Sequence, residues 1–276
     1  MKTKILALKK RIQAIIDPHK SNEERERDAA EYLIISQPNS GRTWLRVMIG
    51  NIFQELSGLK NIDPENISYF AELSPKIPYV KAVHERFKNP EDYRDKNIIL
   101  LVRDPRDAVI SNYFLKTKRD KSPKWIPKSL SEFIREGYYL DDFIALCNAW
   151  KGYHDLPKSF LLLRYEDIRQ DTQRELKKVI KLLGLQVSDS LIQEAVKRAS
   201  FEKMREKETQ RKLPNETNPN IETNPNIDQE SLKVREAKVG GYQDKISPED
   251  IDFIEKKLDQ ELDPSYGYNY FTKQHK

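Results

Sequence analysis

The chain has 276 residues, of which 37% are hydrophobic and 34% are charged, and its formal net charge is +5. A chain of this length forms one large domain or two small ones. The mild positive charge suits an anionic small ligand and is not the concentrated basic footprint of a nucleic-acid binder. No run approaches the ~20 apolar residues that span a bilayer, so we expect no transmembrane segment.

The N-terminal segment and the single cysteine bear on compartment and chemistry. Residues 1–16 contain lysines but no continuous apolar core and no small-residue cleavage site, so we expect no signal peptide and a cytoplasmic protein. Cys147 is the one cysteine, which excludes an internal disulfide and a cysteine-based metal cluster. It lies in an apolar helical stretch, so we expect it to be buried rather than catalytic.

The first half of the chain predicts a helix, a strand, a loop and a second helix. Residues 1–30 predict a helical extension packed on the rest of the domain. The apolar run at 32–35 is typical of a buried strand, and the Pro- and Gly-containing stretch 38–41 interrupts it. Helical spacing resumes at 43–56. Residues 57–78 carry several prolines, so we expect irregular structure there.

Further apolar runs and amphipathic stretches alternate along the chain. Strands are expected at 79–83, 97–102 and 159–165. Helices are expected at about 105–115, 131–153, 171–183, 188–204 and 248–262. Strands that alternate with helices indicate an α/β fold with a central, largely parallel sheet flanked by helices. We expect residues 31–276 to form this single domain.

Residues 205–232 differ from the rest in composition. The sequence Glu-Thr-Asn-Pro-Asn-Ile occurs at 216–221 and again at 222–227. This is a low-complexity duplication, and we expect a mobile loop there. The segment is either a tolerated insertion or, as the family resemblance given below implies, a lid over a ligand; both alternatives stay open.

The loop after the first strand has the features of an anion site. The first turn of the following helix presents unpaired backbone N–H groups and the positive end of its dipole. Ser40 and Thr43 add hydroxyls, and Arg42 adds a cation. Gly41 lets the backbone come close to a ligand. Trp44 offers a flat face on which an adenine stacks.

A second set of polar residues follows the strand at 97–102. The sequence at 101–111 is Leu-Val-Arg-Asp-Pro-Arg-Asp-Ala-Val-Ile-Ser. Arg103 and Ser111 are eight residues apart, about two helical turns, so they lie near one helix face. An arginine presents a planar fork to a phosphate. Because ligands of α/β folds bind at the carboxyl ends of strands, we expect these residues and the loop to converge on one cleft.

Together these motifs resemble the sulfotransferases that use 3′-phosphoadenosine 5′-phosphosulfate. Ser-Gln-Pro-Asn-Ser-Gly-Arg-Thr-Trp at 36–44 resembles their 5′-phosphosulfate loop, and 101–111 resembles their 3′-phosphate element. Arg-Tyr-Glu-Asp at 164–167 and Ser-Phe-Glu-Lys-Met at 200–204 resemble segments around the adenine. Residues 235–242 resemble a late Arg-Lys-Gly-x-x-Gly motif. The pieces fall in family order over most of the chain, and the resemblance implies a P-loop-like, three-layer α/β fold.

The resemblance also implies a site for the donor, 3′-phosphoadenosine 5′-phosphosulfate, which acts as co-substrate without a metal. The implied residues are Ser40, Gly41, Arg42, Thr43 and Trp44 at the 5′ end, Arg103, Ser111, Arg235, Lys238 and Gly240 at the 3′-phosphate, and Tyr165 and Phe201 with Trp44 around the adenine.

Sulfuryl transfer should resemble in-line phosphoryl transfer, and the acceptor must lose a proton to a general base. His84 follows a strand where the family keeps its catalytic histidine. The family commonly has Lys-x-His, whereas this chain has Lys81 three residues before His84. One extra residue changes which of the two side chains faces the cleft. Glu85 is the alternative base, and a loop histidine without a catalytic role is the other alternative.

The family loop has a lysine, which stabilises the leaving group, where this chain has Asn39. An asparagine donates a hydrogen bond but brings no charge. We hypothesise that Arg42 restores the cation, with Lys81 as a second contributor. The first alternative is a nucleotide-binding protein with little or no transfer activity. The second is a P-loop small-molecule kinase, against which the missing Lys-Ser/Thr of the Gly-x-x-x-x-Gly-Lys-Ser/Thr pattern counts.

The sequence predicts a hydroxyl or amine of a small molecule, glycan or lipid as the acceptor, but neither its identity nor an oligomeric state. The variable segments 57–78 and 116–130 are candidates for the acceptor pocket. Their aromatic residues and those nearby line such a pocket or pack in the core; they are Tyr69, Phe70, Phe114, Trp125, Tyr138 and Tyr139.

Overall fold

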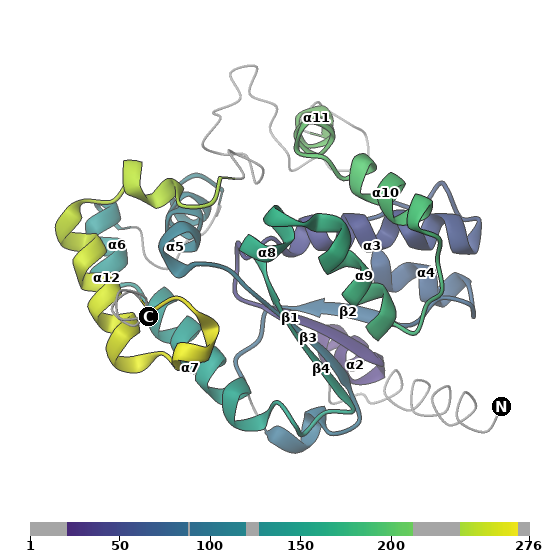
Figure 1. Cartoon of the computed structure of the whole chain (residues 1–276), viewed down its shortest axis with the longest axis horizontal. Coiled ribbons are helices and arrows are strands. Elements are labelled where there is room, and N and C mark those ends of the chain that lie inside the picture. The colour runs from purple at the N-terminus through teal and green to yellow at the C-terminus, as the bar shows by residue number, and fades with distance from the viewer. Residues whose placement is uncertain (1–20, 88, 120–126, 212–237, 270–276) are drawn as a thin grey trace. The chain divides into compact units, whose positions relative to one another are not determined.

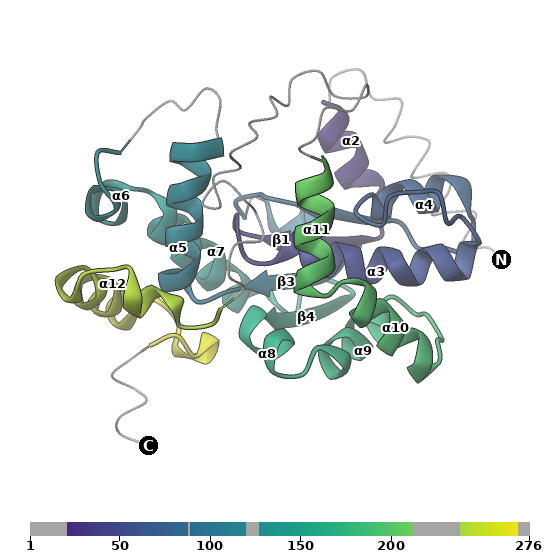
Figure 2. The same cartoon turned by 90° about the horizontal axis from the view of Figure 1, so that it is seen from above.

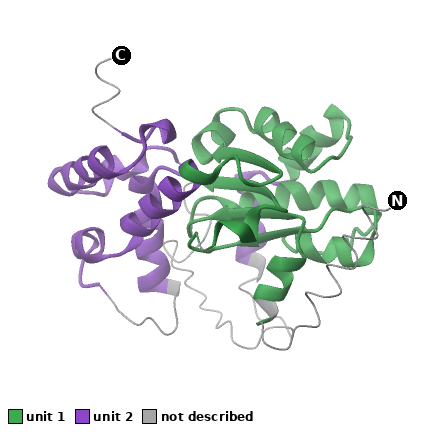
Figure 3. Cartoon of the chain, turned by 90° about the horizontal axis from the view of Figure 1, so that it is seen from below, with its two compact units in different colours: residues 1–102, 152–198 green, residues 103–151, 199–276 purple. Residues whose placement is uncertain are grey.

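The structure is a computed structural model that describes residues 21–87, 89–119, 127–211 and 238–269. It divides the chain into two compact units, neither of which is one continuous stretch. Unit 1 comprises residues 1–102 and 152–198, and unit 2 comprises residues 103–151 and 199–276 (Figure 3). That residues 31–276 form a single domain therefore stays a prediction.

Unit 1 is built around a sheet of strand order β2-β1-β3-β4, in which every described pair is parallel. The strands are β1 (Tyr32–Ser36), β2 (Val80–Val83), β3 (Asn97–Val102) and β4 (Ser159–Arg164). Because the strands are parallel, their carboxyl ends lie at one edge of the sheet. The two central strands are continuous apolar runs because both faces of such a sheet are buried. The predicted central parallel sheet is confirmed.

The helices of unit 1 cover both faces of this sheet. They are α2 (Asn22–Ala29), α3 (Arg42–Ser57), α4 (Ile67–Leu73), α8 (Tyr165–Gln170), α9 (Thr172–Leu182) and α10 (Asp189–Arg198). Helix α2 lies on the other side of the strands from α3 and α9 (Figure 1). Helix α3 packs against both α4 and α10 (Figure 2). It ends, as predicted, before Gly58, whose φ of 76° gives the left-handed turn that glycine favours.

The segment 57–78 corrects one expectation, because it contains helix α4 rather than only irregular structure. Its apolar residues Ile67, Phe70 and Ala71 recur at helical spacing and are buried. The prolines at 64, 75 and 78 all lie outside the helix, so they bound it rather than break it. The ring of Phe70 meets that of Phe53 at 6.0 Å, which fastens α4 to α3.

Unit 2 is helical in its described part. Its helices are α5 (Pro105–Phe114), α6 (Leu130–Glu136), α7 (Tyr139–Tyr153, of which the last two residues belong to unit 1), α11 (Phe201–Arg211) and α12 (Pro248–Glu261). A short π-helix, Leu115–Arg119, follows α5. Helix α12 begins as predicted, with Pro248 at its first position and the Ser247 side chain accepting from the N–H of Asp250. Cys147 is buried, as predicted, and burial raises the pKa of its thiol.

Helix α11 corrects the expectation of a loop from residue 205. The sequence Phe-Glu-Lys-Met-Arg-Glu-Lys-Glu-Thr-Gln-Arg contains no glycine or proline and consists largely of strong helix formers, so the helix continues to Arg211. The guanidinium carbon of Arg205 lies 5.9 Å from the centre of the Phe201 ring, one turn earlier. The tandem repeat, Trp125 and Arg235 lie outside the described residues.

Candidate functional site

The backbone of the loop between β1 and α3 restricts which residue types fit at two positions. Asn39 has a φ of 65° and Gly41 a φ of 92°, both in the left-handed region. Asparagine is among the few non-glycine residues that tolerate this region. A Cβ on Gly41 would lie 2.6 Å from Cδ2 of Tyr165, so only glycine fits. The left-handed backbone at position 39 thus explains why an asparagine is accommodated there.

The polar groups of this loop fit an anion. Ser40 is 1% exposed, and its Oγ has no hydrogen-bond partner among the described residues. A buried hydroxyl without a partner is uncommon in folded proteins and calls for a ligand or a water. Gly41 stands at the N-cap of α3, where it has no side chain to cap the first turn. Thr43 follows in that turn and is half-buried. These groups favour an anion at this end of the helix.

Trp44 meets two side chains of α8. Tyr165 approaches its ring edge-on at a centroid distance of 5.9 Å, and the guanidinium carbon of Arg169 lies 5.5 Å from its centre. Tyr165 is only 5% exposed and lies directly against Gly41, so it supports the loop and offers little surface to a base. Arg169 was not expected from the sequence, although its spacing of one helical turn from Tyr165 is a usable signal.

His84 comes directly after β2 and points its ring to the end of β1. Its Nδ1 lies 2.8 Å from the carbonyl oxygen of Ser36. A carbonyl only accepts, so Nδ1 carries the proton and Nε2 keeps its lone pair. Desolvation, assisted by Arg42 and Arg46, lowers the pKa of His84 to about 4, against the opposing effect of the Ser36 carbonyl. The ring is therefore neutral near pH 7, as a proton acceptor must be.

Lys81 and Glu85 are both held by α2, whereas the ring of His84 turns to the end of β1. The ammonium of Lys81 pairs with Glu26 of α2. Glu85 Oε2 lies 2.7 Å from Nε of Arg27, also of α2. The structure thus does not bring Lys81 to the loop, which removes the support for its expected catalytic contribution. The extra residue in Lys81-Ala82-Val83-His84 is the cause, since it turns the lysine away.

The 3′-phosphate candidates gather in unit 2 around Asp107, a residue that the sequence analysis did not select. Asp107 is 4% exposed and accepts from the backbone N–H of Gly240 at 2.8 Å and of Tyr242 at 2.9 Å. Burial raises the pKa of its carboxyl. Arg103 donates to the Lys238 carbonyl at 3.5 Å, so the segment 238–242 lies beside the start of α5.

Ser111, Lys238 and Phe201 complete the predicted residues of unit 2. Ser111 Oγ donates to the Asp107 carbonyl at 3.4 Å. The Lys238 ammonium pairs with Asp244 at 2.8 Å on the surface. Phe201 opens α11 and is half-buried. Trp44 belongs to unit 1 and Phe201 to unit 2, so their joint contact with an adenine stays a prediction.

Comparison with known proteins identifies the family of the chain. The model of the sulfotransferase domain family matches residues 30–265. The chain belongs to the sulfotransferase family. The predicted assignment as a sulfotransferase dependent on 3′-phosphoadenosine 5′-phosphosulfate is thereby confirmed at the level of the family.

Relatives of this sulfotransferase are distant in sequence. Sulfotransferase 1E1 of Bos taurus is 26% identical over 214 residues, which span 66% of this chain and 68% of the relative. Mouse sulfotransferase SULT7A1 complexed with PAP matches 90% of this chain and 87% of its own with a TM-score of 0.57 at 20% identity. Retinol dehydratase in a complex with retinol and PAP matches 83% and 80% with a TM-score of 0.58 at 17% identity. These two likenesses show the fold and confirm the predicted P-loop-like α/β class.

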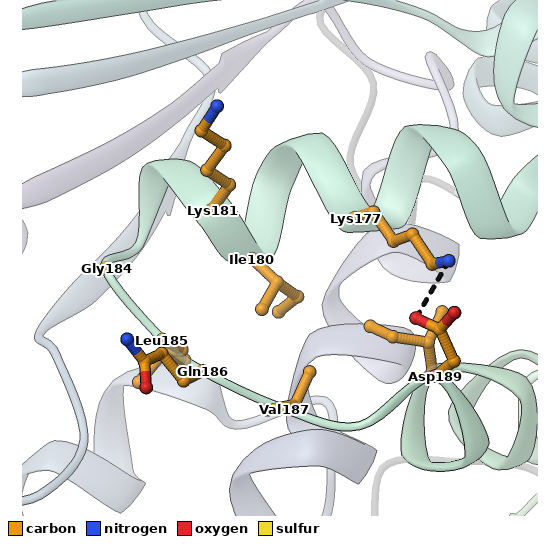
Figure 4. A pocket seen from close by; sticks show the side chains of 9 residues that line it. Lys177, Ile180, Lys181, Gly184, Leu185, Gln186, Val187 and Asp189 are labelled. Carbon is orange, nitrogen blue, oxygen red and sulfur yellow. Dashed lines mark ion pairs between the residues drawn. The ribbon is translucent and has the colours of Figure 1, made fainter.

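A hollow lies between α9 and α10 of unit 1. It is floored by apolar side chains such as Ile180 and Val187. Figure 4 shows Lys177 turned to Asp189, with which it pairs at 2.8 Å, and Lys181 extending away from the apolar floor. Lys177, Lys181 and Asp189 are the charged residues that line the hollow.

Two further observations concern the described residues alone. They contain no group of three or more His, Cys, Asp or Glu side chains that could hold a metal ion; that the reaction needs no metal stays a prediction. No helix among them is long and apolar enough to cross a lipid bilayer.

Proposed function

We propose that this sulfotransferase moves a sulfuryl group to a hydroxyl or amine whose proton is taken by Nε2 of His84. The observation that carries the proposal is the 2.8 Å contact between His84 Nδ1 and the Ser36 carbonyl. It assigns the proton to Nδ1 and leaves Nε2 as the acceptor. The carbonyl belongs to the last residue of β1, so the base is held against the loop that carries Ser40 and Gly41.

The donor that these residues suit is 3′-phosphoadenosine 5′-phosphosulfate, which supplies the sulfuryl group when bound. Ser40, Thr43 and the first turn of α3 hold its 5′ end through backbone N–H groups and the Ser40 hydroxyl, which has no partner among the described residues. Arg42 lies close enough to His84 to lower its pKa, so its charge acts where a leaving phosphate develops negative charge. Arg42 thereby supplies the positive charge that the family has as a lysine at the position of Asn39.

In unit 2, Arg103 and Ser111 bind the 3′-phosphate, with Lys238 and Gly240 from the late segment. The hydrogen bonds of Asp107 to Gly240 and Tyr242 support this assignment, because they hold the late segment beside Arg103. Arg235 completes this set in the prediction from the sequence.

We propose a small molecule that bears a hydroxyl as the acceptor. The retinol dehydratase neighbour was solved with retinol, an alcohol of this class. Among the aromatic candidates, Phe70 and Tyr139 are buried and belong to the core. Tyr69 and Tyr138 are 46% and 76% exposed and remain candidates for acceptor contacts. A glycan or lipid acceptor, a cytoplasmic location and the absence of a nucleic-acid partner stay predictions from the sequence.

The test is transfer of label from the ³⁵S-labelled donor to a panel of phenols, alcohols, sugars and amines. We expect labelled product with the full chain, and a fall of about 10²–10⁴-fold in rate for His84→Gln, the usual contribution of a general base. Binding of 3′-phosphoadenosine 5′-phosphate should be retained. The matched control is His154→Gln, because His154 is an exposed histidine beside Asp155.

The other outcomes separate the alternatives. Saturable binding of the nucleotide without transfer to any acceptor would support a nucleotide-binding protein instead. Phosphate transfer from ATP and magnesium would support a kinase and contradict the proposal. Full activity of His84→Gln would remove His84 as the base.

A further inference from the structure

Glu85 lies at the centre of a buried polar cluster that the proposed chemistry does not use. Its Oε2 is 2.7 Å from Nε of Arg27, and its Oε1 accepts from the hydroxyl of Tyr93 at 3.0 Å. The side chains of Arg27 and Glu85 are 11% and 10% exposed, and Tyr93 is 0% exposed. Both carboxylate oxygens are thus engaged by partners from two other elements, α2 and the 3-10 turn Pro90–Tyr93.

The cluster extends along the chain beyond Glu85. The guanidinium carbon of Arg27 lies 5.2 Å from the centre of the Tyr93 ring. The ring of Phe87 stacks on Tyr93 at 5.2 Å and on Tyr153 at 5.1 Å. The charged groups that face the cluster are Asp28, 3.0 Å from Arg27, and Asp92, 3.6 Å from it. The segment that follows β2 is therefore held by ionic, hydrogen-bonded and aromatic contacts together.

This segment carries the proposed base. Strand β2 ends at Val83, so the sheet no longer fixes the backbone at His84. The ring of His84 is held on one side by the Ser36 carbonyl. Glu85, the next residue, is held by Arg27 of α2, which lies on the other side of the strands from α3. The side chains of His84 and Glu85 thus hold this segment through contacts to β1 and to α2.

We propose that Glu85 is a positioning residue that, through Arg27 and Tyr93, sets where Nε2 of His84 stands. This inference rests on the proposed role of His84. A proton acceptor has to stand within hydrogen-bond reach of the proton that it takes, and a displacement of about 1 Å costs on the order of 10²-fold in rate. Glu85 does not act as the base, because it faces away from the loop and both of its oxygens are occupied.

The experiment compares Glu85→Gln and Tyr93→Phe in the full chain. Glu85→Gln removes the charge that pairs with Arg27, and Tyr93→Phe removes the hydroxyl that donates to Glu85. Each substitution nearly preserves the size of the side chain. We expect kcat to fall about 10–100-fold in both, with little change in the affinity for 3′-phosphoadenosine 5′-phosphate. The acid limb of the pH–rate profile should remain, because His84 still titrates. The matched control is Glu91→Gln, since Glu91 is 61% exposed and pairs only at the surface with Arg94.

Two results would overturn the inference. Loss of the acid limb in Glu85→Gln, with a normal rate in Tyr93→Phe, would make Glu85 the base. Unchanged kcat in both variants would show that the cluster does not position His84. If Glu85→Gln does not fold, as judged by thermal unfolding, the kcat of Tyr93→Phe decides alone, because that variant leaves no charge unpaired.

The His84→Gln variant separates this inference from the proposed function. If His84→Gln is inactive while both cluster variants are fully active, only the positioning role fails. If His84→Gln is fully active, the proposed base fails, and any effect of the cluster variants must have another cause.

Discussion

At the scale of single residues, the charges around His84 lower the pKa of its imidazole. Arg42 and Arg46 lie one turn apart on α3, and both lower the pKa of its imidazole. Arg46 is itself anchored, since its Nε donates to the Glu65 carbonyl at 2.8 Å. The pKa of His84, the proposed base, is thus lowered by desolvation first and by neighbouring cations second. An anion bound at the loop would offset these cations and raise the pKa of His84.

We predict that Arg42→Gln raises the pKa of His84. The substitution removes a positive charge that disfavours the imidazolium, so the pKa moves up from about 4 toward the ordinary value of 6.5. Because only the neutral ring accepts a proton, the acid limb of the single-turnover rate should move to higher pH, by about 1 pH unit. A limb that stays in place or moves to lower pH would contradict this prediction. Arg94→Gln is the control, since Arg94 is 58% exposed and pairs with Glu91.

At the scale of elements, helix α5 organises the described 3′-phosphate candidates. Its first turn carries Asp107, whose two oxygens accept from Gly240 and Tyr242. Arg106, next to it, pairs with Asp104 at 2.7 Å and lies 4.7 Å from the centre of the Tyr242 ring. The helix therefore fastens a segment more than a hundred residues away in sequence.

We predict that Asp107→Asn weakens binding of 3′-phosphoadenosine 5′-phosphate. The amide keeps one acceptor oxygen and turns its NH₂ toward the second backbone N–H. Losing one hydrogen bond to a charged group costs about 1.5–3 kcal/mol, so the affinity should fall about 10–100-fold. Calorimetry should show a much smaller change for adenosine 5′-phosphosulfate, which lacks the 3′-phosphate. Equal losses for both nucleotides would point to a general defect of the fold. Asp252→Asn, in an exposed pair with Lys256, is the control.

At the scale of the whole molecule, the chain leaves unit 1 after Val102 and returns to it at Gly152. Strand β4 arrives only with this return, and it pairs with β3 from Asn97–Ser159 to Val102–Arg164. The sheet is therefore incomplete until the second stretch has been made. Its central strand β3, buried on both faces, would otherwise present an open apolar edge.

We predict that a fragment of residues 1–151 does not fold cooperatively. It keeps β1, β2 and β3 but loses the six paired positions of β4 and the packing of α8, α9 and α10. Each backbone hydrogen bond contributes about 0.5–1.5 kcal/mol net, and a domain is stable by only about 5–15 kcal/mol. Circular dichroism should show no cooperative thermal transition. A sharp transition would contradict the prediction; a chain ending at Asn269, which keeps every described element, is the control.

Local pattern was sufficient for most of the elements. The apolar runs at the four strands, the Ser247-Pro248 start of α12 and the glycine after α3 act through neighbouring residues, so they predicted these elements nearly to the residue. Helix α4 lies between prolines, whose local signal outweighs the short apolar spacing of Ile67, Phe70 and Ala71. Helix α11 continues past residue 204 because Phe201–Arg211 consists largely of helix-forming residues.

The sequence by itself determined the family and predicted the anion loop and the histidine, because these depend on residue types at fixed spacing. The tertiary structure alone decided which side chains meet. It turned Lys81 and Glu85 toward α2, placed Asp107 beneath the late glycine segment, and fixed the tautomer of His84 through Ser36. These contacts join residues far apart in the chain, and side-chain direction follows from register and packing rather than from spacing in sequence.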